Sequence, residues 1–216
     1  MTIAINPGTA FDIETYDGLL AYVTEHLELD ADTVAQLPTM LRLAESRIDR
    51  LCVVPERETS ISITTTAGTQ AYQVPTDYRH ALNLRLTGPN GGTIEQVSLA
   101  YLHDQYSNLV GTPVAFANQN GTFVFGPVPN GTSTIEIAYL NKLDNLTSAN
   151  QTNWLLSENP DVYKYALLFQ VCTWLEDIDA ATAYRAEMMS IIDEINLQGM
   201  RYRSGRPMTP RVCGVP

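Results

Sequence analysis

The spacing of apolar residues changes twice along the 216-residue chain. From residue 15 to residue 51, apolar side chains recur every three or four positions, which is the period of an amphipathic helix. Between residues 59 and 140 they alternate with polar ones, as in half-buried strands. Helical spacing returns from residue 160 to residue 199. The pattern therefore predicts helices, then a set of strands, then helices again.

Two helices are predicted before the strands. Thr15 is placed to cap the first helix. Its apolar stripe consists of Leu19, Leu20, Val23 and Leu27. The acidic segment 29–36 is typical of a turn, and Pro38 fits the start of a second helix that ends near Leu51. Neither helix can bury its stripe alone, so each needs a partner.

The middle of the chain predicts six or seven short strands separated by turn residues. The expected strands are 59–65, 70–74, 81–86, 93–97, 114–117, 122–125 and 132–140. Asn120-Gly121 predicts a tight hairpin, and 93–97 is expected to pair back onto 81–86. Residues 99–106 predict a short surface helix. Short strands with closely spaced turns are typical of a β-sandwich or small barrel.

The last two helices are predicted on either side of a short acidic turn. Residues 154–157 are expected to be extended, with Asn159 as N-cap and Pro160 at the first helical position. The apolar residues of this helix, up to Trp174 and Leu175, are expected in the core. The next helix is expected to be capped by Asp179 and to end at Gly199. So short a connection predicts an antiparallel helical hairpin.

These elements predict an α+β fold. It would be an antiparallel four-helix bundle with an inserted β-sandwich or barrel-like domain and an extended C-terminal arm. The expected boundaries are an N-terminal arm at 1–14, the helical domain at 15–54 and 154–199, the β-domain at 55–153, and the C-terminal arm at 200–216.

The charge of the chain is unevenly distributed. Lys and Arg number 13 against 24 Asp and Glu, a net charge of −11, yet no acidic residue follows Glu194. An acidic body does not favour broad binding of nucleic acid. The basic tail predicts either an arm that docks on an acidic partner or a solvated end. Its candidate contact residues are Arg201, Tyr202, Arg203, Arg206 and Arg211.

Residues that could carry chemistry are sparse, and the sequence predicts no enzyme, cofactor or metal site. His26, His80 and His103 stand outside any catalytic motif, and Cys52, Cys172 and Cys213 lack metal-binding spacing. The acids of 176–179 favour a solvated turn over a metal site. No apolar run approaches a membrane span, and the N-terminus lacks the features of a signal peptide, so we expect synthesis in the cytoplasm.

Six segments, in one order between residues 12 and 198, resemble the adaptor proteins of tailed bacteriophages, also described as head-to-tail connector or tail-tubular-A-like proteins. The segments are TYDGLLAYV at 15–23, LPTMLRLAESRIDRL at 37–51, GTPVAF at 111–116, FGPVP at 125–129, IEIAYL at 135–140, and NWLLSENPDVYKYALL at 153–168 closed by WLED at 174–177.

The resemblance implies a structural virion protein at the head–tail junction. In that family the protein forms a homo-oligomeric, dodecameric ring below the portal, extends the DNA channel and receives the tail. It implies helical domains side by side in the ring, C-terminal arms gripping the portal protein, and a β-domain facing the tail or nozzle protein. Genomic DNA would pass the lumen during ejection without specific binding, which suits an acidic wall.

A different class of function stays open at this point, a carbohydrate- or peptide-binding module. Tyrosine supplies contact area at low entropic cost, and the chain has 11 of them. The candidates on the predicted β-domain are Tyr72, Tyr78, Tyr101, Tyr106 and Tyr139.

Overall fold

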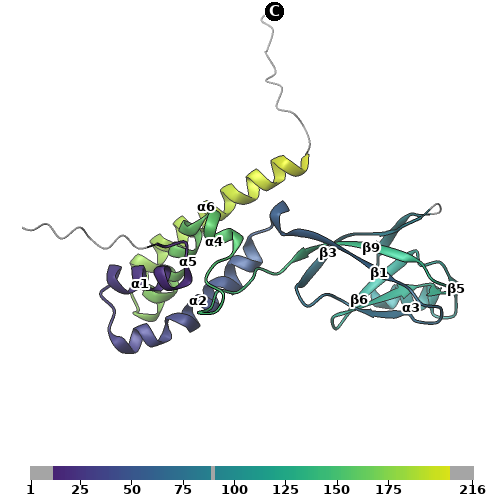
Figure 1. Ribbon diagram of the computed structural model, residues 1–216, viewed down its shortest axis with the longest axis horizontal. Coiled ribbons are helices and arrows are strands. Elements are labelled where there is room, and N and C mark those ends of the chain that lie inside the picture. The colour runs from purple at the N-terminus through teal and green to yellow at the C-terminus, as the bar shows by residue number, and fades with distance from the viewer. Residues whose placement is uncertain (1–11, 89–90, 205–216) are drawn as a thin grey trace, which may run out of the picture. The chain divides into compact units, whose positions relative to one another are not determined.

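The computed structural model describes residues 12–88 and 91–204, with side chains up to residue 201. The chain forms two compact units. The helical unit comprises the chain up to Pro55 and from Leu143 onward, and the β unit comprises Glu56–Lys142 (Figure 1). The boundary differs from the expected one, because Leu143 and Leu146 are buried in the helical core. Residues 143–153 therefore belong with the helices and not with the strands.

The helical unit holds five helices in its described part, so the predicted four-helix bundle is wrong. The helices are α1 (Tyr16–His26), α2 (Ala31–Leu51), α4 (Trp154–Glu158), α5 (Pro160–Trp174) and α6 (Ile178–Ser204). With α3 of the β unit, six α-helices lie in the described ranges. Thr15 caps α1 as predicted, accepting a hydrogen bond from the Gly18 N–H at 3.2 Å.

Helix α2 begins seven residues before the predicted start at Pro38. Asp30 is its N-cap, and the Asp30 Oδ1 accepts a hydrogen bond from the Thr33 N–H at 2.8 Å. Residues 31–36 of the segment expected to be a turn are therefore helical, and Pro38 lies inside the helix. Leu37 and Leu41 on either side of Pro38 are buried, so tertiary packing outweighs the local preference of proline for a helix start.

The segment predicted to be extended, 154–157, is helical in α4. Its cap is Asn153, whose Oδ1 accepts a hydrogen bond from the Leu156 N–H at 2.9 Å. Pro160 is the first residue of α5, as predicted, but the Asn159 side chain makes no capping hydrogen bond. Asn159 alone therefore separates the two helices α4 and α5. The sequence predicted an extended segment followed by a single helix.

Helix α6 starts earlier and ends later than predicted. Asp177, not Asp179, caps it, because the Asp177 Oδ1 accepts a hydrogen bond from the Ala180 N–H at 3.1 Å. The helix continues through Gly199 to Ser204. Gly199 is buried, and a Cβ added there would lie 2.8 Å from the Pro55 Cδ. The absence of a side chain at this glycine lets α6 pack closely against Pro55, and the glycine does not end the helix.

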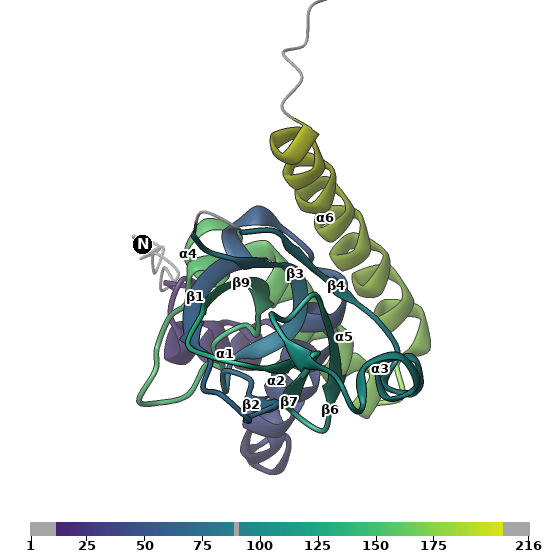
Figure 2. The ribbon, with the colours of Figure 1, turned by 90° about the vertical axis from the view of Figure 1, so that its right-hand side faces the viewer.

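Seven strands of the β unit form one curled sheet in the order β1-β9-β3-β4-β6-β7-β2 (Figure 2). They are β1 (Glu58–Thr64), β2 (Ala71–Gln73), β3 (Tyr78–Leu86), β4 (Thr93–Gln96), β6 (Ala115–Gln119), β7 (Thr122–Gly126) and β9 (Thr134–Asn141). Two further strands, β5 (Val110–Gly111) and β8 (Val128–Pro129), pair with each other. The 3-10 turn η1 (Pro55–Arg57) precedes β1, and α3 (Leu99–Tyr106) has the predicted bounds.

The local pairings follow the prediction, but the order of the sheet does not follow chain order. The hairpin at Asn120-Gly121 joins β6 to β7, with φ of 48° and 74° at the two residues. β4 pairs antiparallel with β3, as expected. β1 and β2 are consecutive in the sequence yet stand at opposite ends of the strand order. The mixed α+β class is therefore confirmed, with a curled sheet in the β unit.

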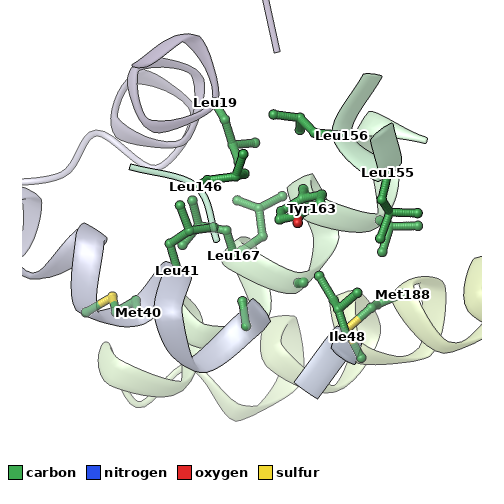
Figure 3. Packing of buried hydrophobic residues seen from close by; sticks show 14 of the residues in the cluster. Leu19, Met40, Leu41, Ile48, Leu146, Leu155, Leu156, Tyr163, Leu167 and Met188 are labelled. Carbon is green, nitrogen blue, oxygen red and sulfur yellow. The ribbon is translucent and has the colours of Figure 1, made fainter. Parts of the chain in front are cut away.

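Each unit has a hydrophobic core of its own. The helical core draws on α1, α2, α4, α5 and α6, and Leu146 of the connecting loop lies among them (Figure 3). The core of the β unit is rich in aromatic residues, with Phe116, Phe123 and Phe125 fully buried. None of the described helices is both long enough and apolar enough to span a membrane.

Candidate interaction surfaces of the helical unit

The turn between α5 and α6 has a well-defined backbone. The Asp177 N–H donates to the Cys172 carbonyl at 2.9 Å, and the Glu176 N–H donates to the Thr173 carbonyl at 3.3 Å. These two bonds are those of a Schellman C-cap, in which the residue after the cap adopts the left-handed conformation. That residue is Glu176, with φ of 62°. Glycine is the usual choice there, so a glutamate is held in a conformation that disfavours it.

Three large apolar side chains are exposed around this turn. Trp174 is 59% exposed, Leu175 47% and Ile178 65%. The prediction that Trp174 and Leu175 belong to the core is therefore wrong. They are the last residue of α5 and its C-cap, and both are exposed there. Three acids stand between and beside them. We call residues Trp174, Leu175, Glu176, Asp177, Ile178 and Asp179 the turn surface.

A second surface is formed where α2, α5 and α6 meet. Leu43, Arg47 and Arg50 follow one another at spacings of four and three on α2, so they lie along one face of that helix. Leu43 is 56% exposed. The Arg47 guanidinium lies 4.6 Å from the centre of the Phe169 ring of α5. Arg185 of α6 is exposed, and its charge acts on Arg47. We call Leu43, Arg47, Arg50, Phe169 and Arg185 the arginine face.

The electrostatics of the arginine face are those of converging positive charges. Burial lowers the pKa of Arg47 below its usual value, and the charges of Arg185 and Arg50 lower it further. A guanidinium stays protonated at physiological pH regardless, so the three charges repel one another. An anionic partner placed over them would relieve that repulsion. The arrangement is suited to binding carboxylates next to exposed apolar groups.

Sequence reasoning identified neither surface as a site. The acids of 176–179 were interpreted as a solvated turn. The available signal was Leu43, an apolar residue out of step with the buried stripe and followed by arginines on its own face. Ile178 gave a similar signal, since it is an apolar residue set between acids.

The predicted portal-binding residues are only partly described. Arg201 is exposed near the end of α6, and the backbone of Tyr202 and Arg203 is helical there. These three residues therefore continue a helix where an extended arm was expected. Arg206 and Arg211 lie outside the described residues, as do most of the N-terminal arm at 1–14 and Cys213.

The other candidate residues are not brought together for chemistry. Cys52 and Cys172 are both buried, and burial raises the pKa of Cys172. The His26 Nε2 lies 3.4 Å from the Tyr184 hydroxyl, and its ring stacks on Tyr22. Within the described ranges, no three His, Cys, Asp or Glu side chains gather closely enough to hold a metal ion.

The five candidate tyrosines do not share an exposed face. Tyr78 and Tyr139 are 8% and 2% exposed in the core of the β unit. The Tyr139 hydroxyl donates to Asp77, and burial together with that carboxylate raises the pKa of Tyr139 to about 12. Tyr101, at 50%, is the most exposed of the five. A cavity of about 330 Å³ between β3, β4 and β6 is lined by none of them.

Comparison with known proteins adds one match. The sequence profile of a family described as SU10 adaptor protein matches residues 14–211, which is most of the 216-residue chain and includes both units. No curated protein sequence matches the chain.

Proposed function

Because the chain belongs to the SU10 adaptor protein family, a family of phage head–tail adaptors, we propose that it forms a ring at the head–tail junction. In this ring the protein binds the portal, extends the DNA channel and docks the tail. The ring is a homo-oligomer of about twelve copies and part of the virion. Its role is structural, with no catalytic step.

The observation that carries this proposal is the extent of the family match. It runs from residue 14 to residue 211 and so includes the helices on both sides of the β unit and part of the basic C-terminal segment. If the family profile matched only one of the two units, it would support a shared domain and not a shared whole-chain function. The net charge of −11 also supports it, because duplex DNA slides more freely past a wall that repels its phosphates.

Portal attachment is proposed to involve Arg201, Tyr202, Arg203, Arg206 and Arg211. Arginine forms paired, charge-assisted hydrogen bonds with carboxylates, so an acidic groove on the portal protein is the expected docking site. Since α6 continues to Ser204, the first three of these residues would be presented on a helix. The β unit is left to contact the tail or nozzle protein.

The test is assembly of the purified protein on purified portal rings, followed by mass photometry and electron microscopy. The wild-type protein should add a ring to each portal. A truncation after Ser204 keeps α6 whole but removes Arg206 and Arg211, so it should weaken attachment while the thermal unfolding temperature stays unchanged.

Arg206→Ala combined with Arg211→Ala should weaken attachment, whereas Arg42→Ala, an exposed arginine of α2, is the matched control. Failure of the wild-type protein to form any ring on portals would reject the proposed function. If the truncated protein attaches normally, only the proposed role of the C-terminal segment is rejected.

A further inference from the structure

We infer that neighbouring copies of this chain contact each other by docking the turn surface of one copy on the arginine face of the next. The two surfaces are complementary in charge and both carry exposed apolar groups. The turn surface presents Glu176, Asp177 and Asp179 beside Trp174, Leu175 and Ile178. The arginine face presents Arg47, Arg50 and Arg185 beside Leu43 and Phe169. The inference deepens the proposed function and rests on it, because it names the contact that would close the ring.

The turn surface is largely exposed to solvent. Trp174, Leu175 and Ile178 lie within one five-residue stretch at the end of a helical hairpin and are about half or more exposed. Aromatic and aliphatic side chains gathered in this way, with a polar rim, mark protein contact sites more often than scattered surface residues do. A buried Trp at the centre of an interface also contributes heavily to affinity.

Glu176 has an unfavourable backbone conformation. Its φ of 62° would suit glycine, and a glutamate there costs about 1 kcal/mol in the isolated subunit. Glutamate thus occupies a position where glycine would stabilise the turn. A carboxylate that pairs with an arginine of another copy accounts for that choice.

The occupant is a second copy because the two surfaces occupy separate parts of one helical unit and carry complementary charges. Both belong to the same helical unit, and α5 packs against α2 and α6 (Figure 1). Arg185 follows Ile178 by seven residues of one continuous helix, which separates them by about 10 Å along its axis. The charges that lower the pKa of Arg47 are the positive ones of Arg185 and Arg50. A carboxylate from a second copy would offset them.

A contact between two different surfaces of identical copies is heterologous. Such contacts propagate from copy to copy and close into a ring when the rotation permits. Each copy is then held on two sides, so a contact of modest area suffices once a template gathers the copies. DNA phosphate is the competing partner for the arginines. It is disfavoured because Leu43 and Phe169 flank them and because the chain as a whole is acidic.

The decisive experiment uses two charge reversals, Asp179→Arg and Arg185→Glu. Both residues are exposed, and Asp177 keeps the cap of α6 in each variant. Alone, each variant should raise the protein concentration needed to fill portal rings by about tenfold or more, since attraction becomes repulsion. Mixed in equal amounts, the two variants should assemble as the wild type does, because every contact in an alternating ring regains opposite charges.

The controls separate charge at this contact from general effects. Arg185→Lys keeps the charge and should assemble, and Glu25→Arg on α1 reverses a charge outside both surfaces and should also assemble. Circular dichroism and thermal unfolding check that each variant is folded. Arg50→Glu serves as a second reversal on the arginine face and should be rescued by Asp179→Arg in the same way.

The outcomes distinguish the inference from the proposed function. If wild-type protein fills portal rings and both reversals do so equally well, the inference is wrong and the proposed function stands. Defective single variants without rescue on mixing would also overturn it. If the arginine reversals leave assembly intact but abolish salt-sensitive binding of a fluorescent DNA duplex, the arginine face binds DNA instead. If wild-type protein forms no ring on portals and no oligomer at high concentration, both proposals fall.

Discussion

The Glu45 carboxylate of α2 accepts a hydrogen bond from the Leu146 backbone N–H at 2.6 Å. One turn further along α2, the Asp49 Oδ1 accepts from the Leu143 N–H at 3.1 Å. Two carboxylates of one helix thus hold the segment that returns from the β unit, and Leu143 and Leu146 enter the helical core beside them. These two hydrogen bonds fix the segment to α2, which explains why residues 143–153 belong with the helices.

Glu45 should make stability depend on pH. It is 3% exposed, its second oxygen has no hydrogen-bond partner among the described residues, and burial raises its pKa. Because the pKa is raised in the folded state, protonation of Glu45 contributes stability at pH values below the ordinary Glu pKa of about 4.3. That contribution is lost as the pH rises through the pKa of the folded protein. Glu45→Gln should therefore unfold at a higher temperature than the wild type at pH 7, with the difference shrinking towards pH 4.

Thermal unfolding followed by circular dichroism between pH 4 and pH 7 measures this difference. Glu25→Gln, an exposed glutamate of α1, is the matched control and should leave the pH profile unchanged. If the unfolding temperature of Glu45→Gln differs from that of the wild type by the same amount at every pH, burial of the Glu45 carboxylate does not cost stability.

Glu176→Gly should stabilise the helical unit by about 1 kcal/mol. Glycine adopts the left-handed conformation of this position without steric cost, whereas glutamate does not. Glu187→Gly, in the middle of α6, should instead destabilise by about 1 kcal/mol, since glycine is a poor helix former. Urea unfolding compares the two. Equal destabilisation by both substitutions would contradict the Schellman geometry of the turn.

Gly199→Ala distinguishes a packing glycine from a helix-ending one. Helix propensity alone predicts that alanine stabilises by about 1 kcal/mol. The structure predicts the opposite sign, because the new Cβ would lie 2.8 Å from the Pro55 Cδ and 3.5 Å from the Val54 Cα. Overpacking of this kind costs about 1–3 kcal/mol. Ser190→Ala on an exposed position of α6 is the control, and urea unfolding gives both values.

Asn153 should be far more sensitive to substitution than Asn159. The buried Asn153 side chain accepts from the Leu156 N–H and donates to the Asp144 carbonyl and the Tyr163 hydroxyl, both at 2.7 Å. Asn153→Ala should cost about 2–3 kcal/mol, because it removes a cap and leaves buried groups unpaired. Asn159→Ala should change stability by less than about 0.5 kcal/mol, since that side chain caps nothing. Similar losses in the two variants would argue against the Asn153 network.

The sequence by itself determined the features that depend on neighbours along the chain. The cap at Thr15, the Asn120-Gly121 hairpin, the bounds of α3 and Pro160 at the start of α5 follow from local hydrogen bonding and backbone preference. The family resemblance also came from the sequence, and the profile match confirms it.

Only the tertiary structure decided what depends on distant residues. Sheet order, the role of Gly199 against Pro55, and the placement of Leu146 on Glu45 join positions that are far apart in the chain. The exposure of Trp174 and the convergence of Arg47 with Arg185 are of the same kind. Hydrophobic periodicity shows which side of a helix is apolar, but it does not show which part of that side another helix will cover. At the α5–α6 turn, Trp174, Leu175 and Ile178 stay exposed.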